Sequence, residues 1–481
     1  MKGRQWIGPI LGILILFFFL VVPPFEPLTS QGMKTLGVFF FTIIWWATVG
    51  VNYPSIICIA LFALTGVMTP EEAFARSFGS WLVLFLIGCM GMGEALRVTG
   101  FSRRFALWFM TLPFTEGHPW RMISMFLLAC TLMGAIMSSS AVCIVFMAIG
   151  VPMVEAVGFK KGDAFAAMLM MGIAWAATAS LAMTPIAHAG NILVMDWIQR
   201  DLGLTINFPH WMSFGIPMGL LVYLLIIGLF RFVVRPDMSR FKEMAANVRD
   251  MANKIGPMKL EEKIALGVFS AVIVAWVLPG TANSILPGLA GYLGKMGYTI
   301  PPLVGASLLC LIHVKSKPVV TFHGWMADGV EWGSVILVVA IMVIGGAISD
   351  PATGIPALLT DVFQPIAASV PTMVFVFIAV IWVVGQTNFM SNLASMMLVY
   401  SIMVPVAIAG QVGNPVALGV VIGAASNYAF ALPSATTTTA IVTGSGWVPV
   451  GFMGRYGVIM VLPVMLLFAF IGYPFACWLF R

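Results

Sequence analysis

Apolar stretches recur from one end of the chain to the other, and many are about eighteen residues or longer, the length at which a helix crosses a hydrocarbon core about 30 Å thick. Of the 481 residues, 60% are apolar and 9% are charged, which leaves too little polar surface for a soluble protein of this size. In lipid, helices satisfy their own backbone hydrogen bonds. The chain is therefore predicted to be an all-α membrane protein.

Eleven apolar stretches are expected to be membrane-spanning helices. They lie at about 6–24, 34–51, 53–69, 80–96, 163–198, 212–234, 263–279, 300–314, 333–350, 414–446 and 452–480. Cytoplasmic connections carry an excess of Lys and Arg. Lys2 and Arg4 precede the first stretch, and segment 235–263 is rich in both residue types. The sequence predicts an inner (plasma) membrane protein with a cytoplasmic N-terminus and an external C-terminus.

The net charge of +6 does not indicate nucleic-acid binding, because the positive residues sit mainly in short connections where they orient a membrane protein. The expected surroundings are a lipid bilayer. All six cysteines fall in apolar stretches without C-x-x-C spacing and are interpreted as packing residues. The chain has no G-x-x-x-x-G-K-[ST] segment, so coupling to ATP within it is not expected.

Two further apolar stretches, 119–158 and 371–410, are interrupted by polar residues. The first begins and ends beside positive residues, Arg121 at one end and Lys160 and Lys161 at the other. Two ends on the same side of the membrane predict a re-entrant hairpin, and irregular backbone at membrane depth is tolerated where it lines a cavity or is buried in protein. The second stretch is expected to form a hairpin of the same kind.

The two halves of the chain match at three landmarks. Thr99-Gly100 corresponds to Thr353-Gly354, Ser138 to Ser391, and Thr184-Pro185 to Leu432-Pro433, at nearly constant separation. An odd number of crossings, about five, separates the two series, so the second copy is expected to be inverted in the membrane. Inverted repeats with interrupted helices are typical of secondary transporters.

Four polar breaks carry the candidate chemistry. They read Ser138-Ser139-Ser140, Thr184 to Asn191, Thr387 to Asn392, and Pro433 to Thr439. Helix N-termini exposed at a break present N–H groups and partial positive charge to an anion, and opposing carbonyl oxygens can hold a cation. Ser, Thr and Asn side chains add ligands without a fixed charge in the membrane. The breaks predict an anion site with neighbouring cation sites.

At these positions the chain resembles the divalent anion:sodium symporter family, which carries dicarboxylates, tricarboxylates and, in some members, sulfate. That family has Ser-Asn-Thr at the tip of each hairpin and Thr-Pro-Pro-Asn in each broken helix. This chain reads Ser138-Ser139-Ser140 and Ser391-Asn392-Leu393 at the two tips. Ser139 thus stands in place of Asn, Leu393 in place of Thr, and neither broken helix keeps Thr-Pro-Pro-Asn whole.

The resemblance implies particular ligands. Substrate carboxylates are expected at Ser138, Ser139, Ser140, His188, Ser391, Asn392, Thr436 and Thr437. One sodium ion is expected near Ser138, Ser139 and Ala187, and a second near Thr387, Ser391, Asn392 and Ala435.

The resemblance also implies an architecture of two scaffold segments, 1–115 and 236–365, and two transport segments, 116–235 and 366–481, with the cytoplasmic loop inside 236–365. It further implies a homodimer and an elevator-type movement. The expected function is secondary active transport of small divalent oxyanions, with C4-dicarboxylates favoured and sodium as the coupled ion. The chain is not expected to be an enzyme, since no base, nucleophile or metal constellation is visible at membrane depth.

Alternatives remain at this level. A sodium-independent anion exchanger or a proton-coupled carrier would keep the same serines and helix N-termini, and the replacement of Asn by Ser139 favours weaker sodium coupling. An anion channel would show pore-lining rings or repeated filter segments in place of paired breaks. Hydroxyl and N–H ligands do not distinguish dicarboxylates from tricarboxylates, sulfate or sulfonates.

His188 stands where the family has a small hydroxyl residue. It is interpreted either as a neutral side chain bonded to a freed carbonyl or as an anion ligand whose protonation links affinity to pH. Glu94 is expected to pair with Arg97 three residues later or to relay protons. The other histidines are interpreted as interface residues, namely His118, His210, His313 and His323.

Overall fold

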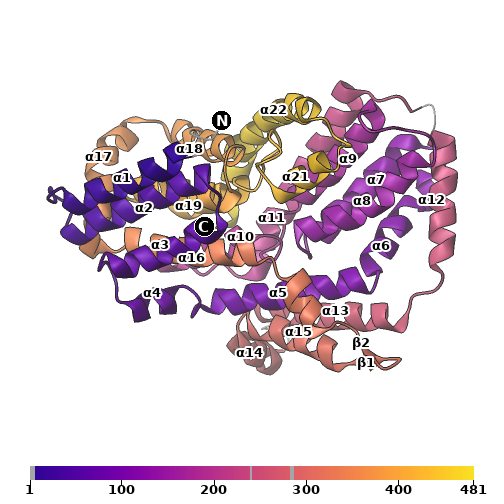
Figure 1. The fold of residues 1–481 in the computed structure, drawn as a ribbon, viewed down its shortest axis with the longest axis horizontal. Helices are drawn as coiled ribbons and strands as arrows, with labels where there is room; N and C mark the ends of the chain where they lie inside the picture. The colour runs from indigo at the N-terminus through magenta and orange to yellow at the C-terminus, as the bar shows by residue number, and fades with distance from the viewer. Residues whose placement is uncertain (1–5, 239–240, 282–285, 481) are drawn as a thin grey trace.

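The computed structural model describes residues 6–238, 241–281 and 286–480, which are mostly helical (Figure 1). Lys2, Arg4 and Arg240, which contribute to the predicted topology, lie outside the described residues. Five helical segments of the described residues are individually long and apolar enough to cross a membrane: Pro70–Val98, Phe208–Val234, Leu260–Thr281, Asn392–Ala409 and Val450–Leu479. Shorter apolar helices make up most of the remainder, so the count of eleven spans stays a prediction.

The first part of the chain forms α1 (Ile7–Val21), α2 (Ser30–Thr48), α3 (Asn52–Leu64), α4 (Pro70–Arg76) and α5 (Trp81–Val98). The expected helix at 53–69 ends early, at Leu64. Thr69 then starts α4 with a capping box, in which its side chain and that of Glu72 each accept a backbone N–H of the other's residue. Local capping therefore starts a short helix in the connection between the expected spans 53–69 and 80–96.

The first hairpin and broken helix lie in the helices that follow: α6 (Phe101–Met110), α7 (Pro119–Gly134), α8 (Ser139–Glu155), α9 (Ala164–Ala179), α10 (Ala189–Leu202), α11 (Phe208–Leu229) and the π-helical turn η3 (Phe230–Val234). The helix expected at 163–198 is interrupted between α9 and α10. Every residue of α9 from Phe165 to Ala179 is buried. A helix that is apolar on all sides is buried, so the break that follows α9 begins in the protein interior.

The second series contains α13 (Leu260–Thr281), α14 (Pro287–Met296), α15 (Ile300–Leu311), the π-helical turn η4 (Gly324–Gly329), α16 (Trp332–Ile348), the 3-10 turn η5 (Pro351–Thr353), α17 (Ile355–Ser369), α18 (Thr372–Thr387), α19 (Asn392–Ala409), α20 (Pro415–Ala425), α21 (Thr437–Gly444), α22 (Val450–Leu467), the π-helical turn η6 (Phe468–Gly472) and α23 (Tyr473–Leu479). The interruptions expected within 371–410 and 414–446 are both present. The apolar pattern of the sequence did not predict α4, α6, α14 and α17, nor α12, which is described below.

Backbone details support the internal repeat. Gly100 and Gly354 each directly precede a helix, with φ of 87° and 73°. Ser138 and Ser391 are the N-caps of α8 and α19, with nearly the same φ, −56° and −53°. The inverted orientation of the two copies stays a prediction.

A short β-hairpin departs from the all-α prediction. Residues His313–Val314 (β1) pair antiparallel with Lys317–Pro318 (β2). The two residues between the strands, Lys315 and Ser316, both have positive φ, 51° and 64°. Positive φ at both central residues matches the twist of a two-residue hairpin, a feature that the apolar pattern does not reveal.

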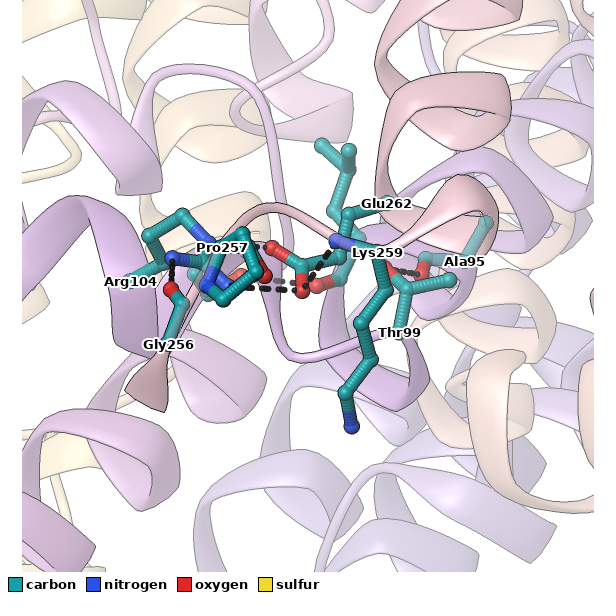
Figure 2. Close-up of polar contacts among 9 residues, drawn as sticks. Ala95, Thr99, Arg104, Gly256, Pro257, Lys259 and Glu262 are labelled. Carbon is teal, nitrogen blue, oxygen red and sulfur yellow. Dashed lines mark hydrogen bonds and ion pairs between the residues drawn. The ribbon is translucent and has the colours of Figure 1, made fainter. Parts of the chain in front are cut away.

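The segment expected as a charged loop contains an amphipathic helix, α12 (Phe241–Ile255), at the edge of the molecule beside α6 (Figure 1). After α12 the chain is anchored by Arg104 of α6, which binds the Glu262 carboxylate through Nε at 2.5 Å and Nη2 at 3.0 Å. The same guanidinium donates to the carbonyls of Gly256 and Pro257 (Figure 2). The hydrogen bond to Glu262 raises the pKa of Arg104, so the arginine remains charged.

Candidate functional site

The tip of the first hairpin presents an uncapped helix N-terminus. Residue Ser138 is the N-cap of α8, but its side chain accepts no hydrogen bond from the first turn of that helix. The first N–H groups of a helix have no partner within the helix, and they carry partial positive charge. The three consecutive serines therefore combine hydroxyl groups with backbone donors at one point.

The first broken helix is hydrogen-bonded to the segment next to this tip. The Thr184 hydroxyl donates to the carbonyl of Ala135, next to the tip, and accepts the N–H of Ala187 at 3.2 Å. The amide of Asn191 donates to the carbonyls of Leu181 at 2.7 Å and Thr184 at 2.8 Å. Side chains of the break thus satisfy carbonyls that the interruption of the helix leaves free inside the protein, which is the condition for a buried break to persist.

The hairpin tip and the broken helix enclose a cavity of about 70 Å³. Four of the expected site residues line it: Ser138, Ser139, Ala187 and His188. The remaining lining comes from α5, from Ile136 and Met137 of the hairpin tip, from the break between α9 and α10, from Leu393 of the second hairpin, and from Glu331 and Ser334 at the start of α16. The N-termini of α8, α10 and α16 all lie at this cavity.

A backbone hydrogen bond determines the protonation state of the His188 ring. It is the N-cap of α10, and its Nδ1 accepts the N–H of Gly190 at 3.3 Å. A nitrogen that accepts a hydrogen bond carries no proton, so the hydrogen bond assigns the neutral form with the proton on Nε2. In this form the ring can donate one hydrogen bond to an oxyanion.

Glu331 was not predicted as a site residue. The hydroxyl of Ser138 donates to its Oε1, and the hydroxyl of Ser334 donates to Oε2 at 3.3 Å. Glu331 lies directly before α16, where a carboxylate is favoured by the helix N-terminus. A lone acidic residue before an apolar stretch was the available sequence signal, but its partner is 193 residues away.

A larger space of about 590 Å³ adjoins the cavity and is called here the vestibule. Its lining includes Ser140, Glu94 and Arg97. Arg97 donates to Glu94 through Nη2 at 2.6 Å and Nε at 2.7 Å, which confirms the predicted pair. The pair leaves the Arg97 side chain 35% exposed, so a basic group remains available at the vestibule.

The second hairpin holds a buried polar cluster. The Thr387 hydroxyl oxygen lies 2.7 Å from Asn392 Oδ1 and 2.6 Å from the carbonyl oxygen of Ser426, and its one hydrogen atom can be donated to either acceptor. Asn392 Nδ2 donates to the carbonyl of Asn427 at 3.3 Å. The Oδ1 atom of Asn427 is buried without a hydrogen-bond partner. Clustered neutral oxygens, with an unsatisfied amide oxygen on the residue whose carbonyl accepts from Asn392, form a set of ligands suited to a hard cation such as Na⁺.

Asn427 also links the two halves of the chain, since its Nδ2 donates to Asn191 Oδ1 at 3.1 Å. The first broken helix and the second hairpin therefore share one hydrogen-bond network. Asn427 was missed in the sequence because it precedes the Pro433 to Thr439 break. Within the described parts of the chain, no group of three or more His, Cys, Asp or Glu residues could hold a metal ion.

Four other expected site residues are not part of the cavity lining. Ser391 is half-buried as the N-cap of α19, and Ala435 is buried in the second break. Thr436 caps α21 by accepting the N–H of Thr439 at 3.2 Å, and Thr437 is exposed. None of these four side chains lines the 70 Å³ cavity.

A family model described as the sodium:sulfate symporter transmembrane region matches residues 4–481. The chain belongs to the sodium:sulfate symporter family. This confirms the resemblance to the divalent anion:sodium symporters, and it places the chain in a family of membrane transporters.

Relatives match along nearly the whole length. The sodium-dependent dicarboxylate transporter SdcS of Staphylococcus saprophyticus is 26% identical over 94% of this chain and 88% of its own. An uncharacterized transporter of Haemophilus influenzae is 23% identical over 97% of this chain and 96% of its own. The crystal structure of the Alcanivorax borkumensis YdaH transporter shares the fold, with a TM-score of 0.56, 12% identity, and coverage of 97% and 98%.

Proposed function

We propose that the chain is a secondary active transporter of small divalent oxyanions, with C4-dicarboxylates as substrates and sodium as the coupled ion. The observation that carries the proposal is the cavity at the N-termini of α8 and α10, lined by Ser138, Ser139 and His188. It offers hydroxyl groups, N–H groups and one imidazole donor, and its lining among the described residues includes no Lys or Arg. Helix N-termini supply anion affinity without fixed charge.

The second half of the proposed site comes from Ser391, Asn392, Thr436 and Thr437. These residues would complete the carboxylate contacts when the transport segments 116–235 and 366–481 move against the scaffold segments 1–115 and 236–365. An elevator movement of this kind, in a homodimer in the plasma membrane, accords with paired breaks in two repeats. The vestibule beside Arg97 would then be the cytoplasmic entrance, because positive residues mark that side.

Two sodium sites belong to the proposal. The first uses Ser138, Ser139 and Ala187. The second uses Thr387, Ser391, Asn392 and Ala435, and the unsatisfied Oδ1 of Asn427 adds a ligand that the sequence motifs did not suggest. The second site has the stronger support, because Asn392 retains the family's amide, whereas Ser139 replaces an amide with a hydroxyl.

Uptake of labelled succinate into proteoliposomes tests the proposal. A sodium symporter accumulates succinate only with an inward sodium gradient, and replacement of sodium by choline abolishes accumulation. Persistent uptake in choline, but only into vesicles preloaded with dicarboxylate, would assign an exchanger. Thermal stabilisation of the purified protein by succinate, citrate, sulfate and a sulfonate, each with and without sodium, identifies the preferred anion.

Proton coupling is the second candidate, because two titratable side chains other than thiols, Glu331 and His188, line the cavity. Cys89 also lines it, and Glu94, Arg97 and Asp328 line the adjoining vestibule. A proton-coupled carrier would accumulate succinate with an inward proton gradient in sodium-free buffer. A sodium symporter would not.

A further inference from the structure

Glu331 stands at the boundary between the cavity and the vestibule. Three residues line both spaces: Met90 of α5, Ser138 at the hairpin tip, and Glu331 before α16. The hydrogen bond from the Ser138 hydroxyl to Glu331 Oε1 therefore lies on the route from the vestibule of about 590 Å³ to the cavity of about 70 Å³. An anion that moves from the vestibule into the cavity across this boundary meets this contact.

The side of the contact that carries Glu331 is tightly packed. The turn η4 precedes it and is held on α5 by the Trp325 indole, which donates to the Ile87 carbonyl at 2.9 Å. A Cβ on Gly329 would lie 2.9 Å from the Cβ of Glu94. The backbone N–H of Glu331 also faces α5 and donates to Met90 Sδ at 3.4 Å. Glu331 thus belongs to the α5 and α16 body, whereas Ser138 belongs to the hairpin.

The chemistry of this contact resembles that of the proposed substrate. A carboxylate oxygen of Glu331 accepts from the same Ser138 hydroxyl that is expected to bind a substrate carboxylate. Both cannot take that hydrogen atom at once. Two carboxylates held within a few ångströms also repel each other strongly, and the described lining of the cavity includes no Lys or Arg. While the sodium site proposed at Ser138, Ser139 and Ala187 is empty, no positive side chain of that lining offsets the repulsion.

We propose that Glu331 is a gate carboxylate, which closes the cavity while it accepts the Ser138 hydroxyl and which the incoming substrate carboxylate displaces. The displacement step rests on the proposed anion transport. The closure does not, since it depends on the contact between two parts of this chain. The gate also sets specificity, because its negative charge disfavours a dianion more than a monoanion of the same shape.

A native thiol reports on the closure. Cys89 lines the cavity, whereas Cys58, Cys130 and Cys143 are fully buried in the core. The rate of Cys89 modification by a small methanethiosulfonate reagent is measured on the purified protein without substrate, and Cys89→Ala identifies the signal. Glu331→Ala is expected to raise the rate at least about fivefold. Glu331→Gln keeps an acceptor for Ser138 and is expected to stay within about twofold of the wild type.

Binding measurements report on the charge. Glu331→Gln is expected to tighten succinate binding about tenfold or more, because like charges roughly 6 Å apart in a protein site repel by more than that factor. The monoanion monomethyl succinate is expected to gain less. The control Glu71→Gln removes an exposed carboxylate of α4, distant in sequence and outside both spaces, and is expected to change neither readout.

The two readouts separate the gate from the transport proposal. If Glu331→Ala leaves the rate of Cys89 modification at the wild-type value, the gate is overturned. If Glu331→Gln leaves succinate affinity unchanged or affects the monoanion equally, the charge argument is overturned. If succinate fails to bind the wild type while Glu331→Ala still exposes Cys89, the proposed substrate is wrong and the gate stands.

Discussion

Replacement of Arg104 by Ala leaves the Glu262 carboxylate without its main partner. The Glu262 side chain is 3% exposed, so water cannot readily take over from the guanidinium. Removal of one member of a buried ion pair typically costs about 3–5 kcal/mol, much of it the desolvation of the remaining charge. The lost contacts to the carbonyls of Gly256 and Pro257 add little, since those contacts lie at the exposed side of the cluster. We expect Arg104→Ala to lower stability by about 3–5 kcal/mol.

The measurement is a melting curve of the detergent-solubilised protein followed with a fluorogenic thiol dye. Fully buried Cys58, Cys130 and Cys143 supply the signal on unfolding. Soluble domains gain about 2 cal/mol/K of entropy per residue, or roughly 1 kcal/mol/K for 481 residues. The expected loss therefore lowers Tm by at least about 3 °C, and by more if the helices persist in detergent and less entropy is gained.

Two variants test the physical cause. Arg104→Met combined with Glu262→Met removes both charges and keeps the volume, and should return Tm to within about 2 °C of the wild type, because apolar replacement of a whole buried pair is often neutral. Arg249→Ala breaks a pair with Glu116 whose side chains are 53% and 64% exposed, and should lower Tm by less than about 1 °C. A double Met variant that melts as low as Arg104→Ala would refute the reasoning.

Three further predictions concern the site and its packing. His188→Gln keeps a hydrogen-bond donor, so it should retain succinate affinity within about threefold and leave the pH profile of binding unchanged, whereas His188→Ala should weaken binding about fivefold or more. A pH profile that differs between His188→Gln and the wild type would instead show that the wild-type imidazole titrates. Asn427→Ala should raise the sodium concentration for half-maximal uptake about fivefold or more. The control is Ser434→Ala at an exposed position, and the same sodium dependence in the two variants would show that Asn427 is not a sodium ligand. Gly91→Ala places a Cβ 2.3 Å from the Trp325 indole nitrogen and should lower Tm by several degrees. Gly267→Ala meets open space and should leave Tm unchanged or raise it. The same Tm in the two variants would contradict the close packing of Gly91 against Trp325.

Much of the architecture was predictable because it depends on the local order of apolar and polar residues along the chain. Polar residues that interrupt long apolar runs located the ends of α7, α9 and α18 and the helix starts after Ser138 and Ser391. The Glu94–Arg97 pair followed from helical spacing alone, since residues three apart share a helix face. Short helices that do not follow an apolar run, such as α6 and α12, escaped prediction for the same reason.

The sequence by itself determined that the chain is a helical membrane protein with breaks at Ser138 and Ser391, because periodicity and polarity are properties of neighbouring residues, and its resemblance to a transporter family added the expected function. Only the tertiary structure decided which partners those breaks meet. Ser138 meets Glu331, 193 positions away, and Asn191 meets Asn427, 236 positions away. Such pairs depend on how the helices pack, and a single apolar helix face is compatible with many neighbours. An acidic residue before α16 thus acquired its proposed role as a gate from the fold.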